Sequence, residues 1–198
     1  MTKQQRLPVV IKCMLPQLTS STSNIVRNYI PVYPDWPKTG VRYLNTVELC
    51  QNPGAFDLSV QWFKAVAETC NAQDIFAADA RGFIWGAPTA NHCKLPLHVV
   101  RKPGKLPGAV WNQTYELEYG TDTLELLAST PPGNRQILIV DDVLATGGTA
   151  EAICKLLHNN LNIPYTSMSV AVLVNLTFLS GQKLLEEKGI QVFGLLNE

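Results

Sequence analysis

The chain has 198 residues, of which 46% are hydrophobic, which is enough for one domain with a full core and few for two. Its 16 Lys and Arg residues balance its 16 Asp and Glu residues, so the formal net charge is zero. Because such a chain has no general positive field, composition gives no reason to expect binding to nucleic acid or to an anionic membrane. Any anion site must therefore be local and built from particular residues.

The first 30 residues are expected to form an irregular arm, with a Thr/Ser cluster at Thr19–Ser23. Pro8, Lys12 and Pro16 interrupt the apolar stretch of this arm, which argues against a signal peptide, and no apolar run approaches the ~20 residues of a membrane span. Three prolines between positions 31 and 37 exclude a continuous helix there, and residues 35–40 are predicted to form an ordered loop.

The cysteines are odd in number, five, and none forms a C-x-x-C pair. This pattern argues against a disulfide framework or a zinc site and favours a reducing compartment, so we expect a cytoplasmic protein. Cys93 beside His92 could be interpreted as a nucleophile with its base, but neighbours in sequence rarely point toward each other.

From about residue 56 onward, apolar patterns alternate between the periods of helix and strand. Leu58, Trp62, Val66 and Cys70 recur at steps of four, which predicts a buried helical stripe. Short apolar or β-prone runs predict buried strands, separated by helical segments. The predicted strands are Ile75–Ala78, Leu97–Val100, Ile137–Val140, Met168–Val174 and Ile190–Leu195, and the further helices are about Gly82–His92, Thr149–Asn159 and Gln182–Lys188.

This alternation predicts an α/β domain with a mainly parallel sheet, in which a ligand binds outside the carboxyl ends of the strands. One connection is unusually long. Residues Arg101–Gly120 are rich in Lys, Gly and Pro, and loops above ~12–15 residues in a compact domain are usually functional or disordered.

The strongest functional signal follows the strand Ile137–Val140. Asp141 and Asp142 come directly after it, a short loop containing Gly147 and Gly148 comes next, and a helix then begins. A helix N-terminus presents unpaired N–H groups and a partial positive charge, so it binds phosphate well. The glycines allow close backbone approach, and the aspartates can accept hydrogen bonds from ribose hydroxyls.

Two other interpretations of this segment are open. It could be an ordinary strand–turn–helix joint, with Thr149 as the helix N-cap and both aspartates solvated. A Walker A loop would need a lysine that this loop lacks, which disfavours nucleoside triphosphate hydrolysis.

The segment from Ile137 to Thr149 resembles the ribose-phosphate signature of the type I phosphoribosyltransferases. Residues 33–37, 80–84, 100–108 and 115–120 resemble the adenine phosphoribosyltransferase family in the same order, and the resemblance covers about residues 30–196. It implies transfer of the phosphoribosyl group of phosphoribosyl diphosphate to adenine, giving AMP and diphosphate, by a Mg²⁺-dependent homodimer.

The implied fold is the type I phosphoribosyltransferase fold, with a mainly parallel central sheet, flanking helices and a small hood over the base. On this view residues 31–198 form a single domain, with the hood at about 31–50 and a mobile loop at about 101–120. Mg²⁺ prefers oxygen ligands and usually bridges substrate phosphates, so the expected metal is held mainly by phosphoribosyl diphosphate. No direct protein ligand is expected, and Asp79 and Asp142 could contact the metal through water.

The resemblance also implies roles for individual residues. Glu118, Tyr119 and Arg81 are the expected catalytic residues, and Tyr43 and Leu44 are expected to contact the base. The other expected substrate contacts are Ala145, Thr146, Gly147, Gly148 and Thr149 to the ribose 5-phosphate, Asp141 and Asp142 to the ribose hydroxyls, and Arg81, Arg101, Lys102 and Lys105 to the diphosphate. The alternatives are a core position for Tyr43, an exposed strand position for Glu118 and a solvated loop for the basic residues.

Two segments depart from the family pattern and bear on the choice of base. Asn45 stands where the family usually has an acidic residue, and residues 175–182 have lost three charged positions. Transfer to another purine or an analogue is therefore an alternative. A second alternative is a non-catalytic regulator that binds phosphoribosyl diphosphate, but it would need a DNA-binding module of ~70 residues, for which this chain leaves no room.

Overall fold

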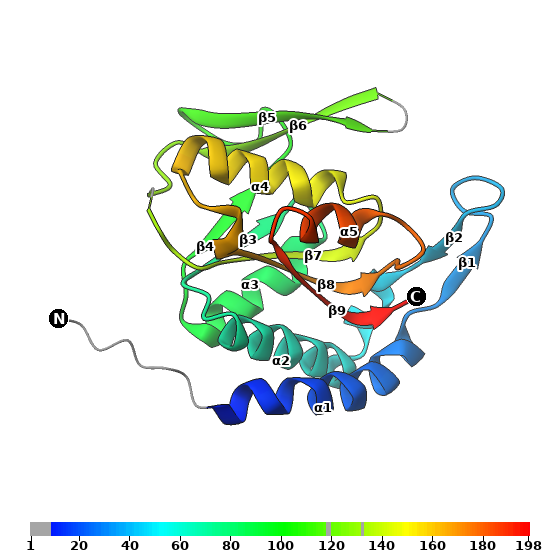
Figure 1. Ribbon diagram of the computed structural model, residues 1–198. Helices are drawn as coiled ribbons and strands as arrows, with labels where there is room; N and C mark the ends of the chain where they lie inside the picture. Colours follow the sequence, from blue (N-terminus) through cyan, green and yellow to red (C-terminus); the bar gives the residue numbers. More distant parts are fainter. Residues whose placement is uncertain (1–8, 118–119, 132) are drawn as a thin grey trace.

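The computed structural model describes residues 9–117, 120–131 and 133–198. Its centre is a five-stranded sheet with the strand order β4-β3-β7-β8-β9, in which every neighbouring pair is parallel. Helices cover both faces of this sheet (Figure 1). The strands are β3 (Asp74–Ala78), β4 (Leu97–Val100), β7 (Ile137–Leu144), β8 (Met168–Asn175) and β9 (Gln191–Asn197). The predicted parallel α/β architecture is confirmed.

The two faces of the sheet pack against different helices. One face contacts α1 (Val9–Val26), α2 (Pro53–Thr69) and α3 (Gly82–Cys93), and the other contacts α4 (Gly148–Leu161) and α5 (Gly181–Glu186). Side chains alternate along a strand, so Leu138 joins the core under α2 and α3 while Ile139 joins the core under α4. Burial on both faces explains why the central strands are continuously apolar.

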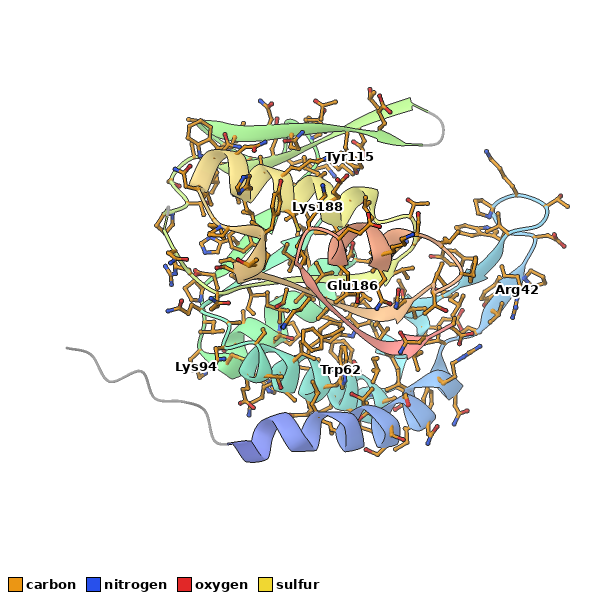
Figure 2. All side chains as sticks on the ribbon, viewed as in Figure 1. Arg42, Trp62, Lys94, Tyr115, Glu186 and Lys188 are labelled. Atoms are coloured by element: carbon orange, nitrogen blue, oxygen red, sulfur yellow. The ribbon has the colours of Figure 1, made fainter. Side chains whose placement is uncertain are left out.

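The expected irregular N-terminal arm is wrong for residues 9–29, which form α1 and a short 3₁₀ helix (Arg27–Tyr29). Packing against α2 compensates for a sequence that forms helix poorly. Thr19 donates to the carbonyl of Leu15 within α1, and its Oγ1 accepts from Trp62 Nε1 on α2 at 2.8 Å. Figure 2 labels Trp62 on α2, the helix beside α1. None of the described helices is long and apolar enough to cross a membrane.

Residues 32–51 form a small unit beside the carboxyl ends of the sheet strands. Its strands β1 (Val32–Pro34) and β2 (Arg42–Leu44) pair in antiparallel register, and a 3₁₀ helix, η2 (Thr46–Gln51), leads into α2. We call residues 32–51 the hood, because Figure 1 shows the β1–β2 ribbon projecting beyond the sheet.

The expected loop at residues 101–120 is a loop only in its first half. From Val110 the chain forms β5 (Val110–Leu117), which pairs with the antiparallel β6 (Gly120–Leu127) above α4 (Figure 1). The strand signal lies in β6, where Leu124 and Leu126 alternate with polar residues and are buried against α4. Most side chains of β5 are polar, so its own sequence gives no such signal.

Element boundaries near the predicted site also differ from expectation. Strand β7 continues to Leu144, so Asp141 and Asp142 lie within the strand and do not follow it. Helix α4 begins at Gly148 with Gly147 as its N-cap, and no side chain caps it, so the interpretation of Thr149 as the N-cap is wrong. Helix α5 ends at Glu186, and β9 extends to Asn197.

Candidate active site

A cavity of about 350 Å³ opens at the carboxyl ends of β3 and β7, which are neighbours in the sheet. This is where open α/β sheets bind ligands. Its lining comes from the turn after β3, the end of β7, the start of α4 with the loop before it, the basic loop after β4 and one residue of β8. The residues are Asp79, Ala80, Arg81, Lys102, Asp141, Asp142, Val143, Leu144, Ala145, Thr146, Gly147, Gly148, Thr149, Ala150 and Val172.

The five residues expected at the ribose 5-phosphate, Ala145 to Thr149, all line this cavity. Gly147 has φ +88°, a conformation that favours glycine. The first amide bonded within α4 is that of Glu151, which donates to Gly147 O at 2.8 Å. The amides of residues 148–150 precede that bond, so the start of α4 supplies the unpaired donors that a phosphate needs.

Asp141 and Asp142 form an acidic pair that lines the cavity. Asp142 is buried, at 2% exposure, and its backbone N–H donates to Asp141 Oδ1 at 2.8 Å. Burial raises the pKa of the Asp141 carboxyl to about 8, and the nearby charge of Asp142 acts in the same direction. Asp141 therefore releases its proton at a higher pH than an ordinary aspartate.

Arg81 lies at the N-cap of α3, directly after the turn that follows β3 and contains a cis Asp79–Ala80 peptide bond. Its Nε is 2.6 Å from Asp142 Oδ2, and its Nη1 donates to the Tyr43 hydroxyl at 3.4 Å. Burial alone would lower the pKa of Arg81, but the charge of Asp142 outweighs it and raises that pKa. Gly82 brings this turn close to β7, because a Cβ there would meet Val140 O at 2.6 Å.

Each of the other basic residues expected at the diphosphate also contacts an aspartate. Arg101 Nε and Lys105 Nζ both lie 3.3 Å from Asp79 Oδ2. Burial opposes ionisation of Asp79, but hydrogen bonds from Lys102 N–H, Arg101 and Lys105 outweigh it and lower the pKa of Asp79. Lys102 lines the cavity, whereas Arg101 and Lys105 reach Asp79 at its edge.

Lys102 connects the basic loop to the β5–β6 hairpin through an ion pair with Asp122. Tyr115, which is labelled in Figure 2, projects from β5 toward α4, where its hydroxyl donates to Asp122 Oδ2 at 3.2 Å. The same hydroxyl lies 3.4 Å from Thr149 Oγ1. Tyr115 and Asp122 were not predicted as site residues, and no feature of their local sequence indicates this contact.

The expected base contacts lie in the hood, outside the cavity lining. The Tyr43 ring packs against Trp36 with centroids 4.3 Å apart, and Leu44 is half-buried. Trp36, half-exposed, was not predicted as a site residue, although it falls in a segment that the resemblance covers. The expected catalytic residues Glu118 and Tyr119 lie outside the described residues.

Oxygen ligands for a cation are present at the cavity, because Asp79, Asp141 and Asp142 all line it. Among the described residues, however, no three His, Cys, Asp or Glu side chains come close enough together to hold a metal ion. This donor set fits Mg²⁺ that arrives with a polyphosphate substrate and keeps water ligands.

A family model described as the phosphoribosyl transferase domain matches residues 48–176, more than half of the chain. The matched range runs from the 3₁₀ helix of the hood through the end of β8, and it includes the whole loop from Asp141 to Thr149. The chain therefore has the fold of a phosphoribosyltransferase.

Comparison with individual proteins narrows the class. An adenine phosphoribosyltransferase of Pseudoalteromonas translucida is 39% identical over 180 residues, covering 90% of this chain and 97% of the relative. The crystal structure of adenine phosphoribosyltransferase from Thermoanaerobacter pseudethanolicus superposes with a TM-score of 0.80 and 35% identity, covering 89% of this chain and 99% of the other. The crystal structure of the Saccharomyces cerevisiae enzyme, solved with an imino-altritol bisphosphate and adenine, superposes with a TM-score of 0.79 and 30% identity. The match covers 89% of this chain and 99% of the yeast chain. The chain belongs to the adenine phosphoribosyltransferase family.

Proposed function

We propose that the protein transfers the 5-phosphoribosyl group of phosphoribosyl diphosphate to adenine, forming AMP and diphosphate. The observation that carries this proposal is the cavity in which the start of α4, the acidic pair and two basic side chains meet. The relatives just described share nearly their whole length with this chain and act on adenine by name.

The sugar phosphate fits the part of the cavity formed by residues 145–149. Backbone N–H groups at the start of α4 bind the 5-phosphate, and the hydroxyls of Thr146 and Thr149 add donors. The two ribose hydroxyls lie against Asp141 and Asp142. Because its pKa is raised, Asp141 can retain a proton and donate to a ribose hydroxyl as well as accept from one.

The diphosphate lies on the basic side of the cavity, against Arg81 and Lys102, with Arg101 and Lys105 at the edge. These four cations are paired with Asp142, Asp122 and Asp79 in this structure. A diphosphate has more charge than a carboxylate, so its binding exchanges these partners. The cations then stabilise the negative charge that develops on the leaving group.

Asp79 and Asp142 would hold Mg²⁺ through water when it is bound together with the diphosphate. When bound, the metal neutralises charge on the leaving diphosphate. The basic side chains add to this effect, and neither aspartate needs to act as a direct ligand.

Cleavage of the bond to the anomeric carbon produces positive charge on the sugar. Glu118 stabilises that charge or moves a proton to or from the base, and Tyr119 helps to exclude water from the reacting atoms. Exclusion of water from the closed site protects the activated sugar from hydrolysis.

The base lies under the hood, against the Tyr43 ring and the backbone of Leu44. Trp36 packs on Tyr43 and supports that ring. A backbone donor and acceptor at Leu44 can distinguish the amino group of adenine from the carbonyl of guanine. The protein acts as a homodimer in the cytoplasm, as the family resemblance implies.

A different purine is the second candidate, and the contacts of Asn45 bear on it. Asn45 Nδ2 donates to Glu48 Oε1 at 2.8 Å, and the Tyr33 hydroxyl donates to the same oxygen at 2.6 Å. The hood therefore keeps a carboxylate three residues beyond the position where the family usually has one.

The test is diphosphate release from phosphoribosyl diphosphate and Mg²⁺ with adenine, guanine, hypoxanthine and xanthine in parallel. We expect turnover with adenine and little with the other three. Asp142→Asn, measured alongside, should turn over slowly, which ties the activity to this cavity. Activity with another base would show that the specificity proposed here is wrong. Activity with none of the four bases would favour the non-catalytic regulator that binds phosphoribosyl diphosphate.

A further inference from the structure

A buried hydroxyl in the hood contacts the acidic pair of the cavity. Thr46 is fully buried, at 0% exposure, and its Oγ1 donates to Asp142 Oδ2 at 2.6 Å. Thr46 opens the 3₁₀ helix that follows β2, whereas Asp142 belongs to β7. This hydrogen bond therefore connects the hood to the floor of the sugar cavity, although Thr46 does not line the cavity itself.

Asp142 Oδ2 has a second donor, Arg81, whose Nε is also 2.6 Å away. The two donors differ in freedom. The side chain of Arg81 is 45% exposed at the cavity and can turn toward another anion, whereas Thr46 is enclosed by the protein. The proposed function requires Arg81 to move to the diphosphate. Among the described contacts, Thr46 is then the side-chain donor that remains on Asp142 Oδ2.

We propose that Thr46 is a positioning residue, which keeps the Asp142 carboxylate directed at the ribose hydroxyls while Arg81 binds the diphosphate. This inference rests on the proposed function. A buried carboxylate that loses both donors would be left unsatisfied, which is costly, and it would be free to rotate away from the sugar. Thr46 prevents both effects without touching the substrate.

The proposal predicts a difference between two ligands that share the ribose and its 5-phosphate. Phosphoribosyl diphosphate withdraws Arg81 from Asp142, so the carboxylate then depends on Thr46. AMP has no diphosphate, so Arg81 remains on Asp142 and the loss of Thr46 matters less. A general weakening of the fold would affect both ligands alike.

The experiment measures binding of phosphoribosyl diphosphate with Mg²⁺, and of AMP, to the full chain by calorimetry without adenine. Thr46→Val keeps the side-chain shape and removes the donor. We expect its Kd for phosphoribosyl diphosphate to rise about tenfold or more, the range for a lost hydrogen bond to a charged group. Its Kd for AMP should change less than about threefold, because the Arg81 hydrogen bond to Asp142 remains. Thr46→Ser keeps the donor and should bind both ligands like the wild type.

Thr89→Val is the matched control. Thr89 is equally buried, but its hydroxyl has no hydrogen-bond partner within the described part of the chain, so this change should leave both affinities unaltered. Should Thr46→Val not fold, Thr46→Ala removes the same donor and carries the same comparison. Unchanged binding of phosphoribosyl diphosphate, or an equal loss for both ligands, overturns the role of Thr46. Wild-type protein that binds neither ligand would instead overturn the proposed function, and this inference with it.

Discussion

Gly147 and Gly181 are in direct backbone contact, because a Cβ atom added to Gly147 would lie 2.9 Å from the Cα of Gly181. The contact joins the loop at the ribose 5-phosphate to the first residue of α5. From the other side, a Cβ on Gly181 would lie 2.3 Å from Ala145 O and 2.8 Å from Gly147 N. Helix α5 therefore supports the loop through close contacts between backbone atoms, which cannot shift without moving the helix or the loop.

Gly181→Ala should displace the loop and weaken binding of the sugar phosphate. We expect the KM for phosphoribosyl diphosphate to rise about ten- to a hundredfold, because small misplacements of binding groups are costly. The KM for adenine should change little, since the hood is separate from α5. Overpacking should also cost about 1–3 kcal/mol of stability. Steady-state kinetics with each substrate varied in turn check this split.

Gly54→Ala is the control for this change, because a Cβ at Gly54 meets no atom closer than 3.6 Å. It should leave both KM values unaltered. Equal KM values for Gly181→Ala and the wild type would contradict a supporting role for α5.

The raised pKa of Asp141 predicts a pH dependence of stability. Between its ordinary value of 3.8 and about 8, the folded state keeps a proton that the unfolded state has lost. Stability associated with this group is therefore fully present below pH 3.8 and falls as pH rises toward 8. Asp141→Asn removes this dependence, so its stability relative to the wild type should increase steadily from pH 5 to pH 8. Urea unfolding of both proteins across this range measures the difference. A difference that stays constant would show that Asp141 titrates normally.

Glu118→Ala should reduce kcat much more than substrate affinity, by about 10–1000-fold, the range associated with general acid–base groups. The reason is that charge at the anomeric carbon develops only in the transition state. Glu116→Ala is a matched control, because Glu116 is an exposed glutamate of β5 that lies two positions before Glu118 in the sequence. Comparable losses in both variants, or a loss of affinity for both substrates, would point to damage to the hairpin.

A further prediction concerns the helix that follows the hood. The Asn52 side chain caps α2 by accepting from the Ala55 N–H at 2.9 Å. Asn52→Ala should lower the free energy of unfolding by about 1 kcal/mol, whereas Asn52→Ser should keep most of the stability that the cap contributes. For a chain of this size the expected fall in Tm is about 2–4 °C. Activity per folded molecule should not change, and the exposed neighbour Gln51 provides a control by Gln51→Ala.

Much of the fold could be predicted from local patterns. Continuous apolar runs such as Ile137–Val140 predicted the central strands, because strands buried on both faces admit few polar residues. The N-terminal helix could not be predicted in this way. Its stability comes from packing against α2, including the Trp62 to Thr19 hydrogen bond, and residues 43 positions apart are not related by any local pattern. Strands β5 and β6 were both missed, although Leu124 and Leu126 of β6 alternate with polar residues, and β5 depends on pairing with β6.

The sequence by itself determined the chemistry of the cavity loop: two aspartates, two glycines and a helix start lie within nine residues, from Asp141 to Thr149, and local geometry brings them together. Only the tertiary structure decided which charges meet. Arg81 pairs with Asp142, Lys102 with Asp122, and Thr46 donates to Asp142 across 96 positions of the chain. The physical reason is that hydrogen bonds and ion pairs act over a few ångströms, and the packing of the hood, sheet and hairpin sets those distances.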